Sequence, residues 1–479
     1  MQLIYEKTVQ GRRAITLDPL DVPDASLPRE LCREKAAELP EVAEIDVIRH
    51  FTNLSRRNFG VDSHFYPLGS CTMKYNPKIA EAVAALPGFG QLHPQLSSSE
   101  AYWPLCQGAF ELLYETEKWL AEIAGMKQTC LQPIAGAHGE LAGTLLIAAY
   151  HRERNHAHKD TILIPDSAHG TNPASAAIAG FKVVEVPSHE DGTMRLDSVK
   201  AAMTENVAGL MMTCPNTHGL FEPVVAEIAD YLHQHDALLY YDGANLNAII
   251  GKARPGDLGF DVMHYNLHKT FATPHGMGGP GSGPVGVGER LEKFLPGPRV
   301  VKRGETFALE MPEKSIGRLS QFFGNFGMAV RAYAYMRHLG KDGLREVGEN
   351  AVLNANYIWA RLKDAYTPAF DLPFMHECIF TAAPEAKKGV RALDIAKALL
   401  DYGYHAPTVY FPLTVKESIM IEPTETESRE TLDAFCDAML EIAKKIETDP
   451  DSFHDAPTTT PVGRLDEVRA ARQLNCACL

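Results

Sequence analysis

The sequence predicts an α/β protein built on a largely parallel sheet, and two observations lead to that class. Short apolar segments typical of buried strands alternate with helical segments in the middle of the chain. The strands expected from this pattern cover residues 161–165, 181–186, 207–214 and 237–241. Polar residues follow them directly, as they do where parallel strands present ligand-binding loops at their carboxyl ends.

Length and composition describe an ordinary folded protein. The 479 residues, 45% hydrophobic and 22% charged, suffice for two domains or for one large domain with extensions. The net charge of −15 argues against a nucleic-acid surface. There is neither a run of about 18 apolar residues nor an apolar signal core at the start, so we expect a cytoplasmic protein outside the membrane.

Cysteine usage favours reduced thiols. The nine cysteines are odd in number and scattered, which does not suit a disulfide framework. Cys476 and Cys478 form a C-x-C pair that is too short for a metal site without distant partners. We therefore expect no metal, with zinc as the weaker alternative.

The first 80 residues are rich in proline and charge and are expected to form an N-terminal arm, with helices over 28–39 and 41–55. The arm ends in YPLGSCTMKYNP, residues 66–77, where small, hydroxyl and basic residues lie between two prolines. This composition suits either an ordered loop with exposed backbone donors or a plain connector. We expect a large domain over 81–327, a small C-terminal domain over 328–448 and a tail over 449–479.

The next elements are two helices separated by a glycine-containing turn. Apolar residues recur at helical spacing over 103–124, and Gly125 is expected to end this helix because glycine is favoured at helix C-termini. The turn 132–139 contains Gly136, Ala137 and His138 and precedes a helix expected over 140–152. Its N–H groups are suited to a cofactor phosphate, although such turns are also common helix starts. His138 would either lie flat on an aromatic ring or belong to the helix cap.

The loops that follow the expected strands share one face of the sheet. This face collects His169, Thr171, Asn172, Asn216, Thr217, Asp242 and the approach to Lys269. Further on, helices are expected over 328–339, ending at Gly340, and over 344–364. Segments 377–381, 392–402, 418–422 and 431–446 then predict a small α+β unit.

Lys269 lies between an apolar run and a loop with six glycines over 276–286. An unprotonated lysine amine attacks aldehydes and forms Schiff bases. Asp242 lies 27 residues before Lys269 and directly follows an expected strand, a position where a carboxylate can pair with a protonated ring nitrogen. Each residue alone also fits a non-catalytic role, Lys269 as a surface lysine and Asp242 as a turn former. Together, their order is typical of enzymes that bind pyridoxal 5'-phosphate (PLP).

Six segments carry a more specific resemblance: PLGSCTMKYN, LQPIAGAHGELAG, DSAHGTNPASAA, YYDGANLNAI, NLHKTFATPHGMGGPGSGPVGV and MIEPTETES. With them, nearly the whole chain resembles the glycine decarboxylase P-proteins of the glycine cleavage system. Its length matches the lysine-bearing second subunit of the two-subunit form. The resemblance implies an aspartate-aminotransferase-type (fold type I) PLP enzyme, with a mostly parallel central sheet and a smaller C-terminal α+β domain.

The resemblance also implies roles for residues of this chain. Lys269 is the Schiff-base lysine, Asp242 pairs with the pyridine nitrogen, and His138 stacks on the ring; these three are the expected catalytic residues. The other expected cofactor contacts are Gly136 and Ala137 for the phosphate, Asn216 or Thr217 for the ring hydroxyl, and Asn266 or His268 for the phosphate. The substrate loop at the glycine mouth is expected to contain Ser70, Thr72 and Lys74.

The implied reaction is PLP-dependent decarboxylation of glycine, with release of CO2 and transfer of the aminomethyl group to the lipoyl arm of the H-protein. The implied assembly is a heterotetramer with a homologous, lysine-free first subunit, two copies of each. One alternative is another fold type I PLP enzyme, either an aminotransferase or an amino-acid decarboxylase. The second alternative is a noncatalytic scaffold subunit, and the presence of Lys269 argues against it.

Overall fold

The computed structural model describes residues 2–35, 37–276, 279–371 and 373–474. The chain divides into two compact units, one formed by residues 1–60 with 460–462 and the other by the rest. Each unit is described by itself. Among the described residues, no helix is both long enough and apolar enough to cross a membrane.

The N-terminal unit contains two short 3₁₀ turns, Ile4–Lys7 and Arg29–Leu31, and one α-helix, α1, over Glu44–Ser55. The prediction of a helix near 41–55 is confirmed by α1, whose start is capped by a hydrogen bond from Ala43 N to Asp46 Oδ2 (3.1 Å). The predicted helix over 28–39 is wrong, because only Arg29–Leu31 turns among the residues described there. Leu31 and Leu39 are exposed, so no packed face stabilises a helix in this segment.

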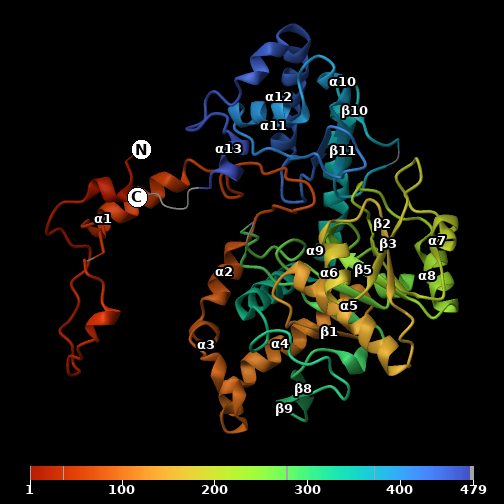
Figure 1. The fold of residues 1–479 in the computed structure, drawn as a ribbon, viewed down its shortest axis with the longest axis horizontal. Helices are drawn as coiled ribbons and strands as arrows, with labels where there is room; N and C mark the ends of the chain where they lie inside the picture. Colours follow the sequence, from red (N-terminus) through yellow and green to blue (C-terminus); the bar gives the residue numbers. More distant parts are fainter. Residues whose placement is uncertain (1, 36, 277–278, 372, 475–479) are drawn as a thin grey trace. The chain divides into compact units, whose positions relative to one another are not determined.

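A seven-stranded sheet forms the centre of the second unit (Figure 1), with the strand order β1-β7-β6-β5-β4-β2-β3. Strands β3, β2, β4, β5 and β6 are parallel neighbours, whereas β7 pairs antiparallel with both β6 and β1. The predicted α/β class with a mostly parallel sheet is therefore confirmed. The strands are β1 Gln128–Cys130, β2 Thr161–Pro165, β3 Lys182–Val186, β4 Val207–Thr213, β5 Leu238–Gly243, β6 Val262–Tyr265 and β7 Val285–Val287.

The central strands β4, β5 and β6 are buried on both faces, which explains why they are largely apolar without alternation. Along β5, Leu239 and Tyr241 pack in one core cluster and Leu238 and Tyr240 in another, because successive side chains point to opposite faces. Helices α4 (Trp103–Ala124) and α8 (Val225–Gln234) supply the first cluster, and α5 (Gly136–Glu153) the second. Helices α6 (Thr171–Ile178) and α7 (Leu196–Ala202) complete the crossovers between parallel strands.

A long helix, α9 (Phe326–Leu362), leads to a second sheet. Gly340 interrupts α9 with φ 63°, so the helix break expected at this glycine is confirmed. The second sheet is antiparallel, in the order β10-β11-β13-β12, and packs with α11 and α12, which Figure 1 shows in blue. Its elements are β10 Thr367–Pro368, β11 Cys378–Thr381, β12 Thr408–Val409, β13 Ser418–Ile421, α11 Ala392–Asp401 and α12 Arg429–Thr448.

Residues 61–80 contact the second sheet. Leu68 forms an isolated bridge with Ile421, and Gly69 lies so close to β13 that a Cβ there would fall 2.2 Å from Met420 Cγ. The four-part division of the chain stays a prediction. The remaining elements are α2 Lys78–Ala84, α3 Pro87–Gly90, β8 Arg299–Arg303, β9 Thr306–Glu310, α10 Ala383–Ala386 and α13 Glu467–Arg472.

The seven cysteines in the described part of the chain are free thiols, as the sequence predicts. Cys476 and Cys478 lie outside the described residues.

Candidate active site

Asp242 and Lys269 follow neighbouring strands. Asp242 is the penultimate residue of β5 and is paired in register with His264 of β6, which lies five residues before Lys269. Because the two strands are parallel, the residues that follow them meet at one edge of the sheet. The pairing of lysine and aspartate inferred from sequence order thus has a topological basis.

The Lys269 amine is held by oxygen acceptors. Its Nζ donates to Ser70 O (2.6 Å) and lies 3.4 Å from Asn245 Oδ1. The side chain is half-buried, and Ser70 adopts a left-handed backbone conformation, with φ 60°. Both acceptors are neutral, one a main-chain carbonyl and the other a side-chain amide. These contacts therefore position the amine without forming an ion pair.

The Asp242 carboxylate is buried and makes few hydrogen bonds. Its Oδ1 accepts from Ala244 N (3.1 Å), and His264 Nε2 lies 3.4 Å away without hydrogen-bond geometry. On the other side of that ring, His264 Nδ1 is 2.7 Å from the Tyr240 hydroxyl. Burial is the largest influence on His264 and lowers its pKa, which favours the neutral ring.

A second acid, Glu140 of α5, lies beside Asp242. Its carboxyl accepts hydrogen bonds from Thr171 Oγ1 (2.8 Å) and Ser175 Oγ (3.3 Å). Ligand atoms of Glu140, Asp242 and His264 all lie within 4.8 Å of one another. Burial, and then the charge of Asp242, raise the pKa of Glu140 to about 8. Near neutral pH the pair therefore carries mainly one negative charge rather than two.

The start of α5 forms a cradle of main-chain donors. Its N-cap, Ala135, supplies no side-chain cap, so the first N–H groups of this 18-residue helix are left for another acceptor. A Cβ on Gly136 would lie 2.6 Å from Asn266 Oδ1, an atom that is buried without a hydrogen-bond partner in the described structure. Such a helix end binds anions well.

Two histidines flank this cradle. His138 Nδ1 accepts from Ile134 N (3.3 Å), and His268 Nδ1 accepts from Ser282 N (3.2 Å). Burial lowers the pKa of His138, and burial with the nearby His275 lowers that of His268 to about 3. Both rings are therefore neutral, with the proton on Nε2 where Nδ1 is the acceptor. A cleft of about 530 Å³ is lined by residues including Ala135, His268 and Gly281.

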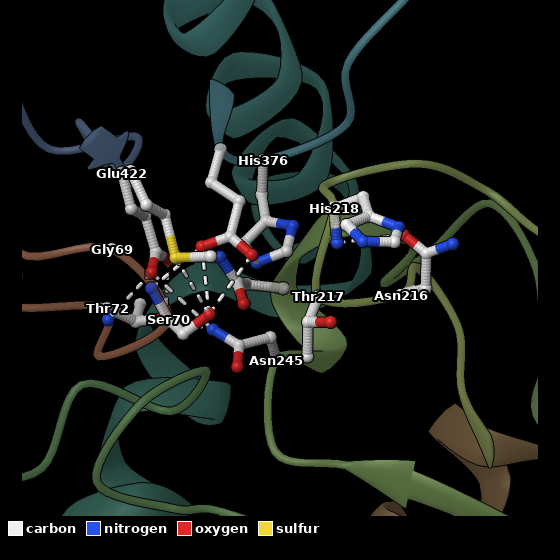
Figure 2. A network of polar contacts seen from close by, with 12 residues as sticks. Gly69, Ser70, Thr72, Asn216, Thr217, His218, Asn245, His376 and Glu422 are labelled. Carbon is white, nitrogen blue, oxygen red and sulfur yellow. Dashed lines mark hydrogen bonds and ion pairs between the residues drawn. The ribbon is translucent and has the colours of Figure 1, made fainter. Parts of the chain in front are cut away.

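The loop with Ser70 and Thr72 is anchored by two buried acids that lie next to strands of the small sheet, Glu377 before β11 and Glu422 after β13. Figure 2 shows Ser70, Thr72 and Glu422. Glu377 accepts from Ser70 N (2.7 Å) and Ser70 Oγ (3.1 Å). Glu422 accepts from Thr72 N (2.9 Å) and from the Thr72 hydroxyl. Burial raises the pKa of Glu377 to about 7 and also raises that of Glu422. These bonds fix the loop against the amine of Lys269.

Lys74 has a different environment from the one expected at a glycine-binding mouth. Its buried Nζ contacts Glu425 Oε1 (2.6 Å), Thr270 O (2.8 Å) and the Tyr335 hydroxyl (3.2 Å). Burial opposes the charge, but the pairing with Glu425 outweighs it, so the pKa of Lys74 is raised. With three partners for its three N–H groups, Lys74 holds the loop rather than offering a free donor.

Of the two residues expected at the ring hydroxyl, Asn216 is fully engaged in its own loop. Its amide donates to Gly192 O (2.9 Å) and Glu222 Oε1 (2.6 Å). Its carbonyl accepts from the backbone N–H groups of His218 (3.0 Å) and Leu220 (3.2 Å). The Thr217 hydroxyl donates to Ser167 O and keeps its lone pairs, so Thr217 is the better candidate.

Sequence reasoning missed four polar residues that complete the site, namely Glu140, Asn245, Glu377 and Glu422. Asn245 joins the two halves of the network, because its Nδ2 donates to Thr72 Oγ1 (2.9 Å) while its Oδ1 faces Lys269. Glu140, Asn245 and Glu422 lie within segments singled out for their resemblance, which was the available signal. Ala137, expected to donate to phosphate, is exposed in the first turn of α5.

Two family models match the chain. Residues 138–303 match aminotransferase class-V, and residues 347–459 match the glycine dehydrogenase C-terminal domain. Among solved structures, a glycine decarboxylase (P-protein) of the glycine cleavage system has a TM-score of 0.72 and 22% identity, covering 87% of this chain and 93% of that one. A Lactobacillus brevis glutamate decarboxylase gives a TM-score of 0.67 at 15% identity, with 90% and 96% covered.

Close relatives extend over nearly the whole chain. A probable glycine dehydrogenase (decarboxylating) subunit 2 of Caldanaerobacter subterraneus subsp. tengcongensis is 54% identical over 475 residues, which are 98% of this chain and 97% of the relative. The corresponding protein of Alkaliphilus oremlandii is 54% identical over 478 residues, with 99% and 97% covered.

The fold and the site define a fold type I PLP-dependent enzyme. At this level of identity over almost the full length, the chain belongs to the family of glycine dehydrogenase (decarboxylating) subunit 2.

Proposed function

We propose that this chain is the PLP-binding subunit of a glycine decarboxylase that releases CO2 from glycine and transfers the remaining aminomethyl group to the lipoyl arm of an H-protein. The observation that carries the proposal is the placement of Lys269 and Asp242 after neighbouring parallel strands, in a chain whose full-length relatives are named for this activity. The resemblance inferred from the sequence segments agrees with that family.

The residues present fit PLP. The aldehyde requires a lysine amine, which Lys269 supplies, and the ring nitrogen requires a buried carboxylate, which Asp242 supplies. The phosphate requires several donors, which the main-chain N–H groups at the uncapped start of α5 supply. We assign the ring face to His138 and the ring hydroxyl to Thr217.

When bound, PLP supplies an electron sink for the pair of electrons left by the departing CO2. The chain's own residues create the conditions for this. Asp242 keeps a proton on the ring nitrogen by charge pairing, and protonated Glu140 prevents a second negative charge beside it. Ser70 O and Asn245 Oδ1 hold the Lys269 amine.

Decarboxylation is favoured over the alternative of transamination by the full-length relatives, which are named glycine dehydrogenase (decarboxylating) subunit 2. In this proposal Glu377 and Glu422 hold Ser70 and Thr72 of the substrate loop in place beside the Lys269 amine.

Partners form part of the proposal. The relatives are named as subunit 2, which implies a first subunit, and we assign a lysine-free homologue to that role in a complex with two copies of each. Exposed leucines in the N-terminal unit, such as Leu17 and Leu20, provide apolar surface for such an assembly. The lipoylated H-protein is the second partner, and a cytoplasmic location stays a prediction.

The test combines a covalent label with an activity. The purified chain, mixed with its first subunit and PLP, is reduced with borohydride, and the labelled peptide is mapped; the label is expected on Lys269. Exchange of labelled bicarbonate into the carboxyl group of glycine is then measured with and without H-protein. Lys269→Ala is expected to lose both the label and the exchange, whereas Lys252→Ala, at an exposed surface lysine, keeps both. A label on another lysine would contradict the assignment.

A further inference from the structure

A second cluster of polar side chains lies at the opposite end of the central sheet from Asp242. His151 belongs to the last turn of α5, and His156 follows that helix. Asp236 lies just before β5, the strand that carries Asp242 near its other end. One ligand atom from each of the three residues lies within 4.8 Å of the other two. The cluster is separate from the PLP site because β5 extends between them.

The three atoms share an unusual property. His151 Nδ1, His156 Nδ1 and Asp236 Oδ2 are all buried, and none has a hydrogen-bond partner in the described structure. Buried polar atoms without a hydrogen bond are costly, so three of them at one point suit a common ligand, although His156 Nδ1 and Asp236 Oδ2 also lie within ion-pair distance of each other. His151 is itself only 2% exposed.

The tautomer of His151 is fixed by the opposite ring nitrogen. His151 Nε2 lies 2.9 Å from Ala208 O, a carbonyl that can only accept, so Nε2 carries the proton. Nδ1 then presents a lone pair toward the cluster. Burial lowers the pKa of His151 to about 4, which keeps the ring neutral. A neutral imidazole oriented by a backbone carbonyl is the usual arrangement of a metal-binding histidine.

His156 and Asp236 complete the donor set. His156 Nδ1 and Asp236 Oδ2 are 2.8 Å apart but lack the geometry of a hydrogen bond. With metal bonds of about 2.1 Å, two ligand atoms at this separation subtend an angle of about 85° at a shared ion. The other carboxylate oxygen is used elsewhere, since Asp236 Oδ1 lies 3.3 Å from the Tyr150 hydroxyl and 3.4 Å from Arg154 Nη2.

The types of ligand atom in the cluster indicate which cation can bind. Arg154 pairs with Asp236, and Lys159 donates to Val207 O (3.0 Å) and His235 O (2.7 Å) nearby. Ca²⁺ needs many oxygen ligands, and the cluster offers only one free carboxylate oxygen, so Ca²⁺ is not favoured. Two imidazoles and one carboxylate suit first-row transition cations. A cleft of about 440 Å³ lined by His151 and His156 gives access.

We propose that His151, His156 and Asp236 bind a divalent first-row transition cation, for which Zn²⁺ serves as the probe, at a site distinct from the PLP site. Three protein ligands leave at least one position for water. The ion connects the end of α5 to the turn that starts β5, the two elements that carry Glu140 and Asp242 at their other ends.

The test measures Zn²⁺ binding to the PLP-loaded chain in complex with its first subunit, without an affinity tag, by competition with a chromophoric chelator. The wild type is expected to bind one Zn²⁺ that Asp236→Asn and His156→Gln weaken by at least a hundredfold. His338→Ala removes an exposed histidine of α9 and serves as the matched control, with unchanged affinity expected. Because these variants change partly exposed side chains, PLP absorbance should stay at the wild-type level and report on folding.

A spectroscopic arm identifies the ligands. Co²⁺ is expected to give d–d absorption bands in the wild type that are lost in Asp236→Asn. Zn²⁺ affinity that does not change in either site variant would overturn the proposal, as would binding removed only by His275→Ala, which would locate the ion near the PLP site. Absence of binding to the wild type at a hundredfold excess of Zn²⁺ would overturn it as well.

Discussion

At the scale of single residues, the site depends on how many protons its buried acids hold. Glu140 and Asp242 share one neighbourhood, and burial with the charge of Asp242 raises the pKa of Glu140 to about 8. The folded chain therefore keeps a proton on Glu140 that the unfolded chain releases near its ordinary pKa. Stability from this proton is present at low pH and is lost as pH rises through about 8.

Glu140→Gln tests this by fixing the neutral form. We expect the variant to keep the carboxyl-exchange rate of wild type at pH 7 within a few fold. Above pH 8 the wild type is expected to decline as the second negative charge forms beside Asp242, whereas the variant does not. The pH profiles of the two proteins, measured with saturating PLP, give the comparison. Identical alkaline limbs would show that Glu140 does not titrate in this range.

Glu422 provides a second residue-scale prediction. Its carboxylate accepts two hydrogen bonds from Thr72 and faces the amides of Asn245 and Asn247. Glu422→Ala leaves these buried donors unpaired, which is expected to lower the free energy of unfolding by about 1–3 kcal/mol, measured in urea. Glu422→Gln keeps one acceptor and should lose less. An equal loss in both variants would mean that volume, not hydrogen bonding, decides the effect.

At the scale of elements, the start of α5 is the part of the site most sensitive to shape. Gly136→Ala is expected to weaken PLP binding at least tenfold, because the added Cβ would lie 2.6 Å from Asn266 Oδ1 and displace it. Gly170→Ala is the matched control. Gly170 is the N-cap of α6, has φ −61° and has open space where a Cβ would be. PLP affinity of the apoprotein, followed by absorbance, should change only in Gly136→Ala.

The elements themselves were largely predictable from sequence, for a physical reason. Buried parallel strands are short apolar runs. Asp242 lies at the carboxyl end of one such run and Lys269 follows another, so their order in the sequence predicts that both residues lie at the same edge of the sheet. The helix break at Gly340 is likewise local. The wrong helix over 28–39 had suitable residues but no packing partner, which local patterns do not reveal.

The rest of the site depends on contacts between distant parts of the chain. Glu377 is 307 residues from Ser70, and Glu422 is 350 residues from Thr72. No periodicity relates such residues, and an acid that directly follows a short strand, as Glu422 follows β13, is equally consistent with an exposed position. The engagement of Asn216 by Gly192 and Glu222 depends in the same way on the folded loop.

At the scale of the whole molecule, we expect catalysis to rely on surfaces beyond this chain. Glycine offers few atoms for binding energy, so we expect closure of the site to draw on partner contacts. The N-terminal unit carries exposed leucines with little packing of their own, including Leu17 (81% exposed), Leu20 (74%) and Leu39 (74%). Side chains of this kind are costly to leave in water and are typical of surfaces that associate.

We therefore expect deletion of residues 1–40 to abolish stable association with the first subunit while PLP binding to the large unit is kept. Sedimentation of the mixed subunits measures assembly, and borohydride labelling of Lys269 measures cofactor binding. The double variant Leu17→Ser, Leu20→Ser keeps the full-length chain, unlike the deletion, and is expected to weaken association with the first subunit at least tenfold. A double substitution at Leu353 (63% exposed) and Leu413 (88%), which lie outside the N-terminal unit, controls for loss of apolar surface in general. Wild-type association of both N-terminal variants would show that other surfaces hold the complex together.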